Sequence, residues 1–289
     1  MIDPGSLEFT GERFTPECER EIAYEHWHRY AWAAQLTAGK VVVDAACGEG
    51  YGTSLLSRTA ARVTGVDIEA AAIEHARARY GSKSVAFECA SGLNLPLETD
   101  SVDVVVSFET LEHLAEHDEL MGEFRRVLKD DGFLLISSPD RKTYSDETGY
   151  DNPYHVRELY REEFEGLLGR HFPAWRLFGQ KLLFVSALWS MDGQGGAQWL
   201  SDQPDARAHQ PAWPPLYFIA AAAASAAALP ALPAVSLYGD RAESVYQHYN
   251  DEVRKHIRAG TLLAEREAEI AELRRHLDRP WWRRWLGRR

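Results

Sequence analysis

The feature that most constrains this chain is a short run in which a valine-rich stretch leads into an acid and then a glycine loop. Val41–Val43 are β-branched residues typical of a buried strand, which Asp44 closes. Gly48, Gly50 and Gly52 follow at alternate positions, where they let the backbone turn tightly and come close to a ligand. A strand, a glycine loop and a helix in this order place backbone N–H groups and a helix N-terminus beside a small polar ligand.

The next strand ends in a second acid, and this acid favours a nucleoside site over an ordinary tight turn. The segment 62–67 ends in Asp67, 19 residues after Gly48. In nucleoside-binding α/β units, an acid at this place accepts hydrogen bonds from the two ribose hydroxyls. Asp67 can also cap a helix that begins at Ile68, and the two roles are compatible.

With Asp44 ahead of the glycines and Asp67 after them, the chain resembles a class I S-adenosylmethionine-dependent methyltransferase. A dinucleotide dehydrogenase would more usually show Gly-x-Gly-x-x-Gly without an acid closing the first strand. The resemblance implies that S-adenosylmethionine is the cofactor and S-adenosylhomocysteine the product. It also implies that the methionine part of the cofactor lies against Asp44 and the loop backbone, including Ala46, Gly48 and Gly50.

The resemblance implies positions for the rest of the cofactor as well. Asp67 binds the ribose, and Ile68 lies against the adenine. In the family, an acid and a small residue ahead of Leu-Pro hold the adenine amino group, and here Ser91 and Gly92 stand in that place. Ser91 departs from the pattern, because its hydroxyl accepts a hydrogen bond but brings no charge.

Two further segments match the cofactor region of the family. Residues 101–114 resemble its fourth strand and the helix that follows, so that Phe108 should lie beside the cofactor and His113 near the substrate mouth. Tyr30, with Tyr24 and Arg29, is expected to close over the cofactor. The alternative for these three residues is an amphipathic helix that packs on the sheet.

Alternating strand and helix patterns predict an α/β fold with a parallel sheet. The resemblance implies a Rossmann-like, mostly parallel sheet of seven strands with helices on both faces, an N-terminal helical cap and a C-terminal helical extension. The expected domains are a cap at 1–35, a cofactor-binding domain at 36–238 with a lid loop at 191–215, and a helix with a basic tail at 239–289. Expected strands cover 40–45, 62–67, 84–88, 102–108, 132–138, 175–184 and 215–222, and expected helices cover 69–80 and 117–129.

Composition limits the partners of this chain. Its net charge of −12 argues against a nucleic-acid substrate, which favours a basic surface. Its three cysteines have no metal-ligand spacing and favour a reducing, cytoplasmic location. The apolar run 217–235 is rich in alanine and is interrupted by Pro230 and Pro233, so a buried edge strand that continues into a loop is expected rather than a membrane span.

The C-terminal region is basic although the chain is acidic. Residues 252–289 carry 11 Lys and Arg and 6 Asp and Glu. Leu263, Ile270, Leu273 and Leu277 have heptad-like spacing, which fits either a helix packed on its own domain or self-association with a second copy. The Trp- and Arg-rich segment 281–289 suits an acidic partner or peripheral contact with the anionic surface of the inner membrane, and it could equally be a disordered terminus. A glycosyltransferase is a further candidate partner of the C-terminal helix.

The acceptor is indicated by two segments, 9–17 and 152–159, which resemble methyltransferases found with bacterial polysaccharide and O-antigen genes. Those enzymes are expected to methylate sugar hydroxyls, for which a histidine base is suitable. His155 is the expected base, with Glu158 or Asp151 to orient it, and His113 is the rival. The alternative for His155 is a loop histidine that caps the next helix.

Two other functions remain open on the sequence. Glu109, Glu112 and His113 have the spacing of the metal-binding run in O-methyltransferases of quinone biosynthesis, which would imply a metal-assisted small-molecule or quinol methyltransferase. Metal-free relatives share this run, so no metal is expected. The third hypothesis is a cofactor-binding module whose main role is assembly of a glycan-synthesis complex.

Overall fold

The structure is a computed structural model, and it describes residues 21–188, 190–191 and 213–277 of the chain. Several expectations fall outside these residues: the segment 9–17, most of the lid loop 191–215 and the tail 281–289. The chain divides into two compact units, residues 1–238 and residues 239–289, which are considered separately below.

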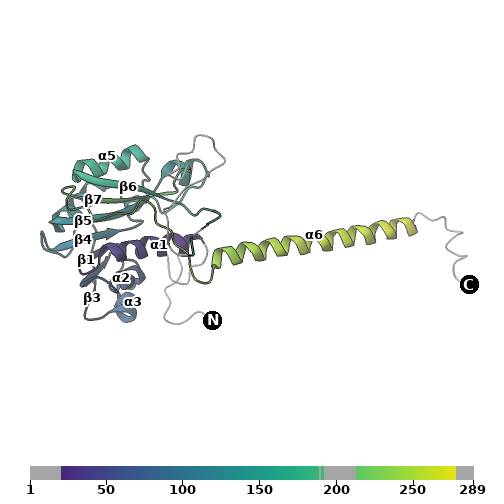
Figure 1. The fold of residues 1–289 in the computed structure, drawn as a ribbon, viewed down its shortest axis with the longest axis horizontal. Coiled ribbons are helices and arrows are strands. Elements are labelled where there is room, and N and C mark those ends of the chain that lie inside the picture. The colour runs from purple at the N-terminus through teal and green to yellow at the C-terminus, as the bar shows by residue number, and fades with distance from the viewer. Residues whose placement is uncertain (1–20, 189, 192–212, 278–289) are drawn as a thin grey trace, which may run out of the picture. The chain divides into compact units, whose positions relative to one another are not determined.

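The first unit is built on one seven-stranded sheet with the order β3-β2-β1-β4-β5-β7-β6. Strands β1 to β5 run parallel, and β7 pairs antiparallel with both β5 and β6 (Figure 1). The strands are β1 Val41–Ala45, β2 Arg62–Asp67, β3 Val85–Cys89, β4 Val102–Ser107, β5 Leu128–Pro139, β6 Ala174–Gln180 and β7 Tyr217–Ala223. The expected mostly parallel, seven-stranded α/β fold is confirmed.

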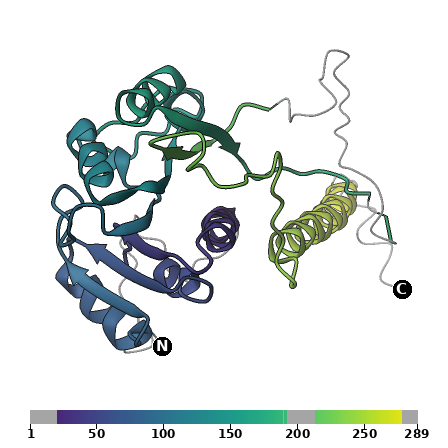
Figure 2. The ribbon, with the colours of Figure 1, turned by 60° about the vertical axis from the view of Figure 1, so that its left-hand side comes forward.

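Helices cover both faces of this sheet. Because side chains alternate between faces along a strand, neighbouring valines of one strand enter different cores. Val43 and Val105 pack with residues of α4 and α5, whereas Val42 and Val104 pack with residues of α1 and α2. Figure 1 shows α1 and α5 on opposite sides of the sheet, and Figure 2 shows α1 lying along the concave face. The helices are α1 Glu21–Leu36, α2 Tyr51–Leu56, α3 Ala70–Tyr80, α4 His117–Val127 and α5 Arg161–His171, with short turns η1 Leu111–His113 and η2 Lys142–Asp146.

The two late strands differ from the sequence expectation. The strand expected at the start of the apolar run is present as β7, but the prediction that it lies at an edge of the sheet is wrong. β7 is paired on both sides, and all seven of its residues are buried. The edge strand is β6, and it ends at Gln180 rather than at residue 184. An alanine-rich strand suits the interior of the sheet, since both of its faces are covered. Among the described residues, no helix is long and apolar enough to cross a membrane.

Gly52 allows α1 and α2 to approach closely behind the glycine loop. A Cβ on Gly52 would lie 2.2 Å from Cζ of the Tyr30 ring. We therefore expect Gly52→Ala to lower the free energy of unfolding by about 1–3 kcal/mol, measured by urea unfolding, because the tyrosine must leave its position. Gly122→Ala on α4 is the matched control: a Cβ there meets nothing within 4 Å, so this variant should be neutral or slightly stabilising. Equal losses in the two variants would contradict the packing account.

Candidate active site

Asp44 ties the first strand to the two helices around it. It is fully buried at the end of β1, where its Oδ1 accepts a hydrogen bond from Tyr30 Oη at 3.1 Å and its Oδ2 accepts one from Thr53 Oγ1 at 2.6 Å. Burial raises the pKa of Asp44 to about 7, while these two hydrogen bonds lower it. Asp44 therefore fixes both α1 and α2 to the floor of the glycine loop.

The glycine loop is hydrogen-bonded to Asp67 at the end of the next strand, β2. Ala46, Gly48 and Gly50 all have positive φ, of 60°, 55° and 91°. Asp67 Oδ2 accepts the N–H of Gly48 at 2.8 Å, and its Oδ1 accepts the N–H of Glu69 at 2.9 Å ahead of α3. Each carboxylate oxygen keeps a second lone pair, so Asp67 can also accept hydrogen bonds from ribose hydroxyls.

The other residues expected around the cofactor fall into two groups. Ile68 is 75% exposed beside Asp67, as an apolar side chain that faces a ligand would be. Ser91 and Gly92 lie in the loop after β3, where Ser91 Oγ accepts the N–H of Leu93. Phe108 and Tyr30 are buried and pack edge to face, with ring centroids 5.2 Å apart. These two rings support the loop from within the core.

A buried charged cluster was not foreseen from the sequence. Arg29 is 0% exposed, and its Nη1 donates to Gln180 Oε1 at 3.0 Å and lies 3.5 Å from Glu109 Oε1. Its guanidinium also lies over the Tyr217 ring, 4.9 Å from the centroid. The members come from α1, β6, β7 and the end of β4, so only the spacing of Glu25 and Arg29 on one helix face could have indicated part of it.

Glu25 predicts a measurable pH dependence of stability. Burial raises its pKa from the ordinary 4.5 to about 7, although Arg29 lowers it. Between pH 4.5 and about 7, the Glu25 carboxyl therefore keeps its proton in the folded state but has lost it in the unfolded state. The free energy of unfolding falls by about 3 kcal/mol as the pH rises through this range. In urea unfolding at about pH 5 and about pH 8, Glu25→Gln should show a smaller loss than the wild type. Glu74→Gln, at an exposed position of α3, should lose as much as the wild type; identical losses in all three proteins would contradict the assignment.

Two histidines meet at the ends of β4 and β5. His155 Nδ1 lies 2.6 Å from Glu158 Oε1, and its Nε2 lies 3.0 Å from Asn152 Nδ2. The His113 ring packs edge to face on the His155 ring at 5.1 Å, and His113 Nδ1 donates to the carbonyl oxygen of Tyr154 at 3.1 Å. The structure thus brings together both expected base candidates and places Glu158 as the partner of His155.

The metal-ligating set suggested by the sequence is rearranged in the structure. Among the described residues, the group able to hold an ion is Glu112, His113 and His155, whose ligand atoms all lie within 4.8 Å of one another. Glu109 is directed elsewhere, because its Oε1 accepts the hydroxyl of Ser137 at 2.6 Å. Glu109 has a φ of 52°, an uncommon backbone conformation that turns its carboxylate toward β5.

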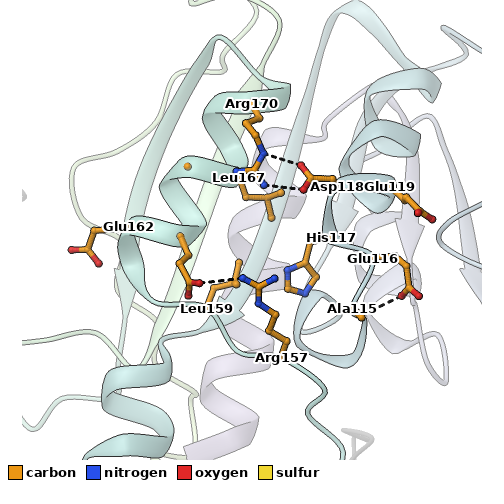
Figure 3. Close-up of a pocket in the computed structure, with 12 residues that line it drawn as sticks. Ala115, Glu116, His117, Asp118, Glu119, Arg157, Leu159, Glu162, Leu167 and Arg170 are labelled. Atoms are coloured by element: carbon orange, nitrogen blue, oxygen red, sulfur yellow. Dashed lines mark hydrogen bonds and ion pairs between the residues drawn. The ribbon is translucent and has the colours of Figure 1, made fainter.

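A separate cleft lies between the start of α4 and the length of α5 (Figure 3). Asp118 pairs with Arg170 across it, at 2.9 and 3.0 Å. Its volume is about 390 Å³, and its polar lining includes five carboxylates and two arginines. None of the expected cofactor or catalytic residues lines this cleft, so it carries no part of the candidate site.

Comparison with known proteins indicates a class for the site. Residues 43–136 match the family model of the methyltransferase domain, and this range includes both acids, the glycine loop and His113. The matched range is thus similar to a methyltransferase domain. It contains most of the residues that were expected to bind the cofactor, whereas His155 lies after its last residue.

The relatives agree with this assignment. A protein of Mycolicibacterium smegmatis, named a probable S-adenosylmethionine-dependent methyltransferase, is 41% identical over 170 residues, or 57% of this chain and 65% of that protein. A Mycobacterium tuberculosis protein of the same designation is 39% identical over 57% of this chain and 61% of its own length. The chain thus spans less than two thirds of the length of these relatives.

Two further comparisons bear on acceptor and fold. A phthiotriol/phenolphthiotriol dimycocerosates methyltransferase of Mycobacterium ulcerans is 35% identical over 113 residues, 38% of this chain and 41% of that protein. A chain from the complex of the Haloferax volcanii Trm112 methyltransferase activator with its candidate methyltransferase is 19% identical, with a TM-score of 0.51 over 69% of this chain and 90% of that one. This last likeness supports the fold of the first unit.

Proposed function

We propose that the protein is an S-adenosylmethionine-dependent O-methyltransferase that acts on a sugar hydroxyl of a nucleotide sugar, a lipid-linked sugar or a polysaccharide. The observation that carries the proposal is the pair of His155 and Glu158 near the ends of β4 and β5, at the edge of the sheet where β1 leads into the glycine loop. In parallel α/β sheets, ligands bind outside the carboxyl ends of the strands, where these groups lie.

The residues at the end of β1 and β2 fit the cofactor. Asp67 has acceptor capacity for two ribose hydroxyls, and Ile68 offers an exposed apolar surface to the adenine. The backbone from Ala46 to Gly50, with its positive φ angles at three residues, would hold the methionine part. A Cβ on Gly50 would meet Ala76 and Phe87 at 2.8 Å, so the loop depends on glycine at this position. When bound, S-adenosylmethionine supplies an electrophilic methyl group on a sulfonium.

His155 is suited to remove the proton of the acceptor hydroxyl. Its Nδ1–H donates to Glu158, which fixes the tautomer and leaves the lone pair on Nε2. Asn152 occupies that lone pair at 3.0 Å, and the acceptor hydroxyl takes its place in the reacting complex. His155 Nε2 would accept the hydroxyl proton as the acceptor oxygen takes the methyl group and the carbon–sulfur bond breaks, which leaves S-adenosylhomocysteine, and Glu158 would stabilise the imidazolium.

A second function is favoured by one specific observation, the group Glu112, His113 and His155. A carboxylate and two imidazoles suit a divalent ion softer than Mg²⁺, which would assist O-methylation of a quinol or another small molecule. Turnover that is lost with a chelator and restored by Mn²⁺ or Zn²⁺ supports this function. Turnover that is indifferent to the chelator supports the histidine base.

The proposal is tested by a methylation screen with isotopically labelled S-adenosylmethionine. We expect label to enter sugar nucleotides or lipid-linked sugars and to resist mild base, as an ether does and an ester does not. Wild-type protein and His155→Ala are compared on each acceptor. Label that enters only quinols or lipids without sugar contradicts the sugar acceptor, and label on nitrogen contradicts O-methylation.

A further inference from the structure

Helix α6, Ser244–Leu277, is a single helix of 34 residues in the second unit (Figure 1). At 1.5 Å per residue it is about 51 Å long. Val245 is the buried residue of this helix, whereas Val253, Leu263 and Ile270 are 55%, 62% and 49% exposed. A helix with this much exposed apolar surface usually buries one stripe against another helix.

Six of the nine large apolar or aromatic residues exposed on α6 belong to a regular stripe, and the other three, Ile257, Leu262 and Leu273, lie outside it. Starting from Tyr246, alternating steps of three and four residues lead to Leu277 through Val253, Leu263 and Ile270. This 3.5-residue average is the repeat of a coiled coil, and 34 residues provide between four and five heptads. The stripe also contains one glycine and four residues with polar or aromatic side chains. These five residues determine which partner helix fits against the stripe.

We infer that α6 pairs with α6 of a second copy of this chain in an antiparallel coiled coil centred between Thr261 and Leu262. The stripe is symmetric about this point. In the antiparallel arrangement, Val253 faces Ile270 of the partner, and Tyr246 faces its Leu277. Each chain contributes every pair once, so the apolar layers occur at both ends of the coil.

The remaining positions of the stripe are complementary only in this orientation. His256 faces Glu267 of the partner, Tyr249 faces Arg274, and Gly260 faces Leu263 at the centre. These pairs bring together an imidazole and a carboxylate, a ring and a guanidinium, and a large side chain and an empty position. All five pairs of the stripe are therefore compatible.

A parallel pair in the same register is disfavoured by the same residues. It would set Glu267 against Glu267 and Arg274 against Arg274 within the apolar seam, and Gly260 against Gly260 would leave a gap. Like charges at facing core positions oppose association, whereas the antiparallel arrangement separates both of them. The charge pattern thus selects a second copy in antiparallel orientation as the occupant of this face.

The oligomeric state of the full chain tests the inference first. Light scattering after gel filtration should give a dimer of twice 32.6 kDa. Ile270→Lys should reduce the mass to that of the monomer, and Ala268→Lys, at an exposed position outside the stripe, should leave the dimer intact. Circular dichroism and S-adenosylhomocysteine binding show that both variants are folded. A monomeric wild type, or a dimer that Ile270→Lys does not affect, would overturn the inference.

Cross-linking tests the orientation. Under mild oxidation, a mixture of chains with Val253→Cys and chains with Ile270→Cys should give a disulfide-linked dimer, whereas each variant alone should not. The wild type, with its own three cysteines, gives the background. Efficient cross-linking of either variant with itself indicates a parallel pair and overturns the antiparallel inference.

Discussion

His155→Ala is expected to lower methyl transfer by about 10²–10⁴-fold, which is the usual contribution of a general base. The affinity for S-adenosylhomocysteine should stay unchanged, because His155 lies after the matched range 43–136 and is held by Glu158 rather than by the glycine loop. Single-turnover rates with saturating cofactor measure the first effect, and calorimetry measures the second.

Two further variants separate the roles around His155. Glu158→Gln should lower the rate less than His155→Ala, because the amide still accepts a hydrogen bond from Nδ1 but does not stabilise the imidazolium. His113→Ala should leave most of the rate if His113 only packs on His155. The account is contradicted if turnover survives His155→Ala and is abolished by His113→Ala, since the two histidines would then exchange roles.

Asp67→Ala is expected to weaken cofactor binding by at least about 100-fold. The carboxylate would accept two ribose hydrogen bonds, each worth about 1.5–3 kcal/mol because the acceptor is charged. Asp67 also accepts the N–H of Gly48, so its loss loosens the loop as well as removing the ribose contact. Titration with S-adenosylhomocysteine gives the ratio of dissociation constants.

Matched variants show whether this loss belongs to the ribose contact. Asp67→Asn keeps one acceptor oxygen, so its affinity for S-adenosylhomocysteine should lie between that of Asp67→Ala and that of the wild type. Asp103→Ala removes an acid from β4 that pairs with Lys129 at 2.7 Å, and it should leave the affinity intact. An Asp67→Ala protein that binds as tightly as the wild type would remove the assigned role of this residue.

Much of the sheet could be predicted because local patterns encode it. Each of the first five strands is a β-branched or apolar run that ends near a turn signal, and the acids at the ends of β1 and β2 indicate the ligand edge. The position of β7 between β5 and β6 could not be read in this way. An alanine run shows that a strand is buried, but strand order depends on contacts between distant segments.

In the site too, contiguous motifs could be predicted from the sequence, whereas contacts between distant residues could not. The loop from Ala46 to Gly50 is one contiguous motif, so its backbone conformation could be foreseen from its glycines. The meeting of His113 with His155 joins residues 42 positions apart. The Arg29 cluster draws on one helix and on residues in or after three strands. Only Glu25 and Arg29 share a segment, and contacts between distant segments leave no periodic signal in the sequence.

A crystal structure of the protein with S-adenosylhomocysteine tests the cofactor site most directly. We expect the ribose hydroxyls on the Asp67 carboxylate, the amino-acid part along the backbone from Ala46 to Gly50, and the sulfur facing the side of His155. Binding in the cleft between α4 and α5, or no binding at concentrations well above those that saturate such enzymes, would contradict this expectation.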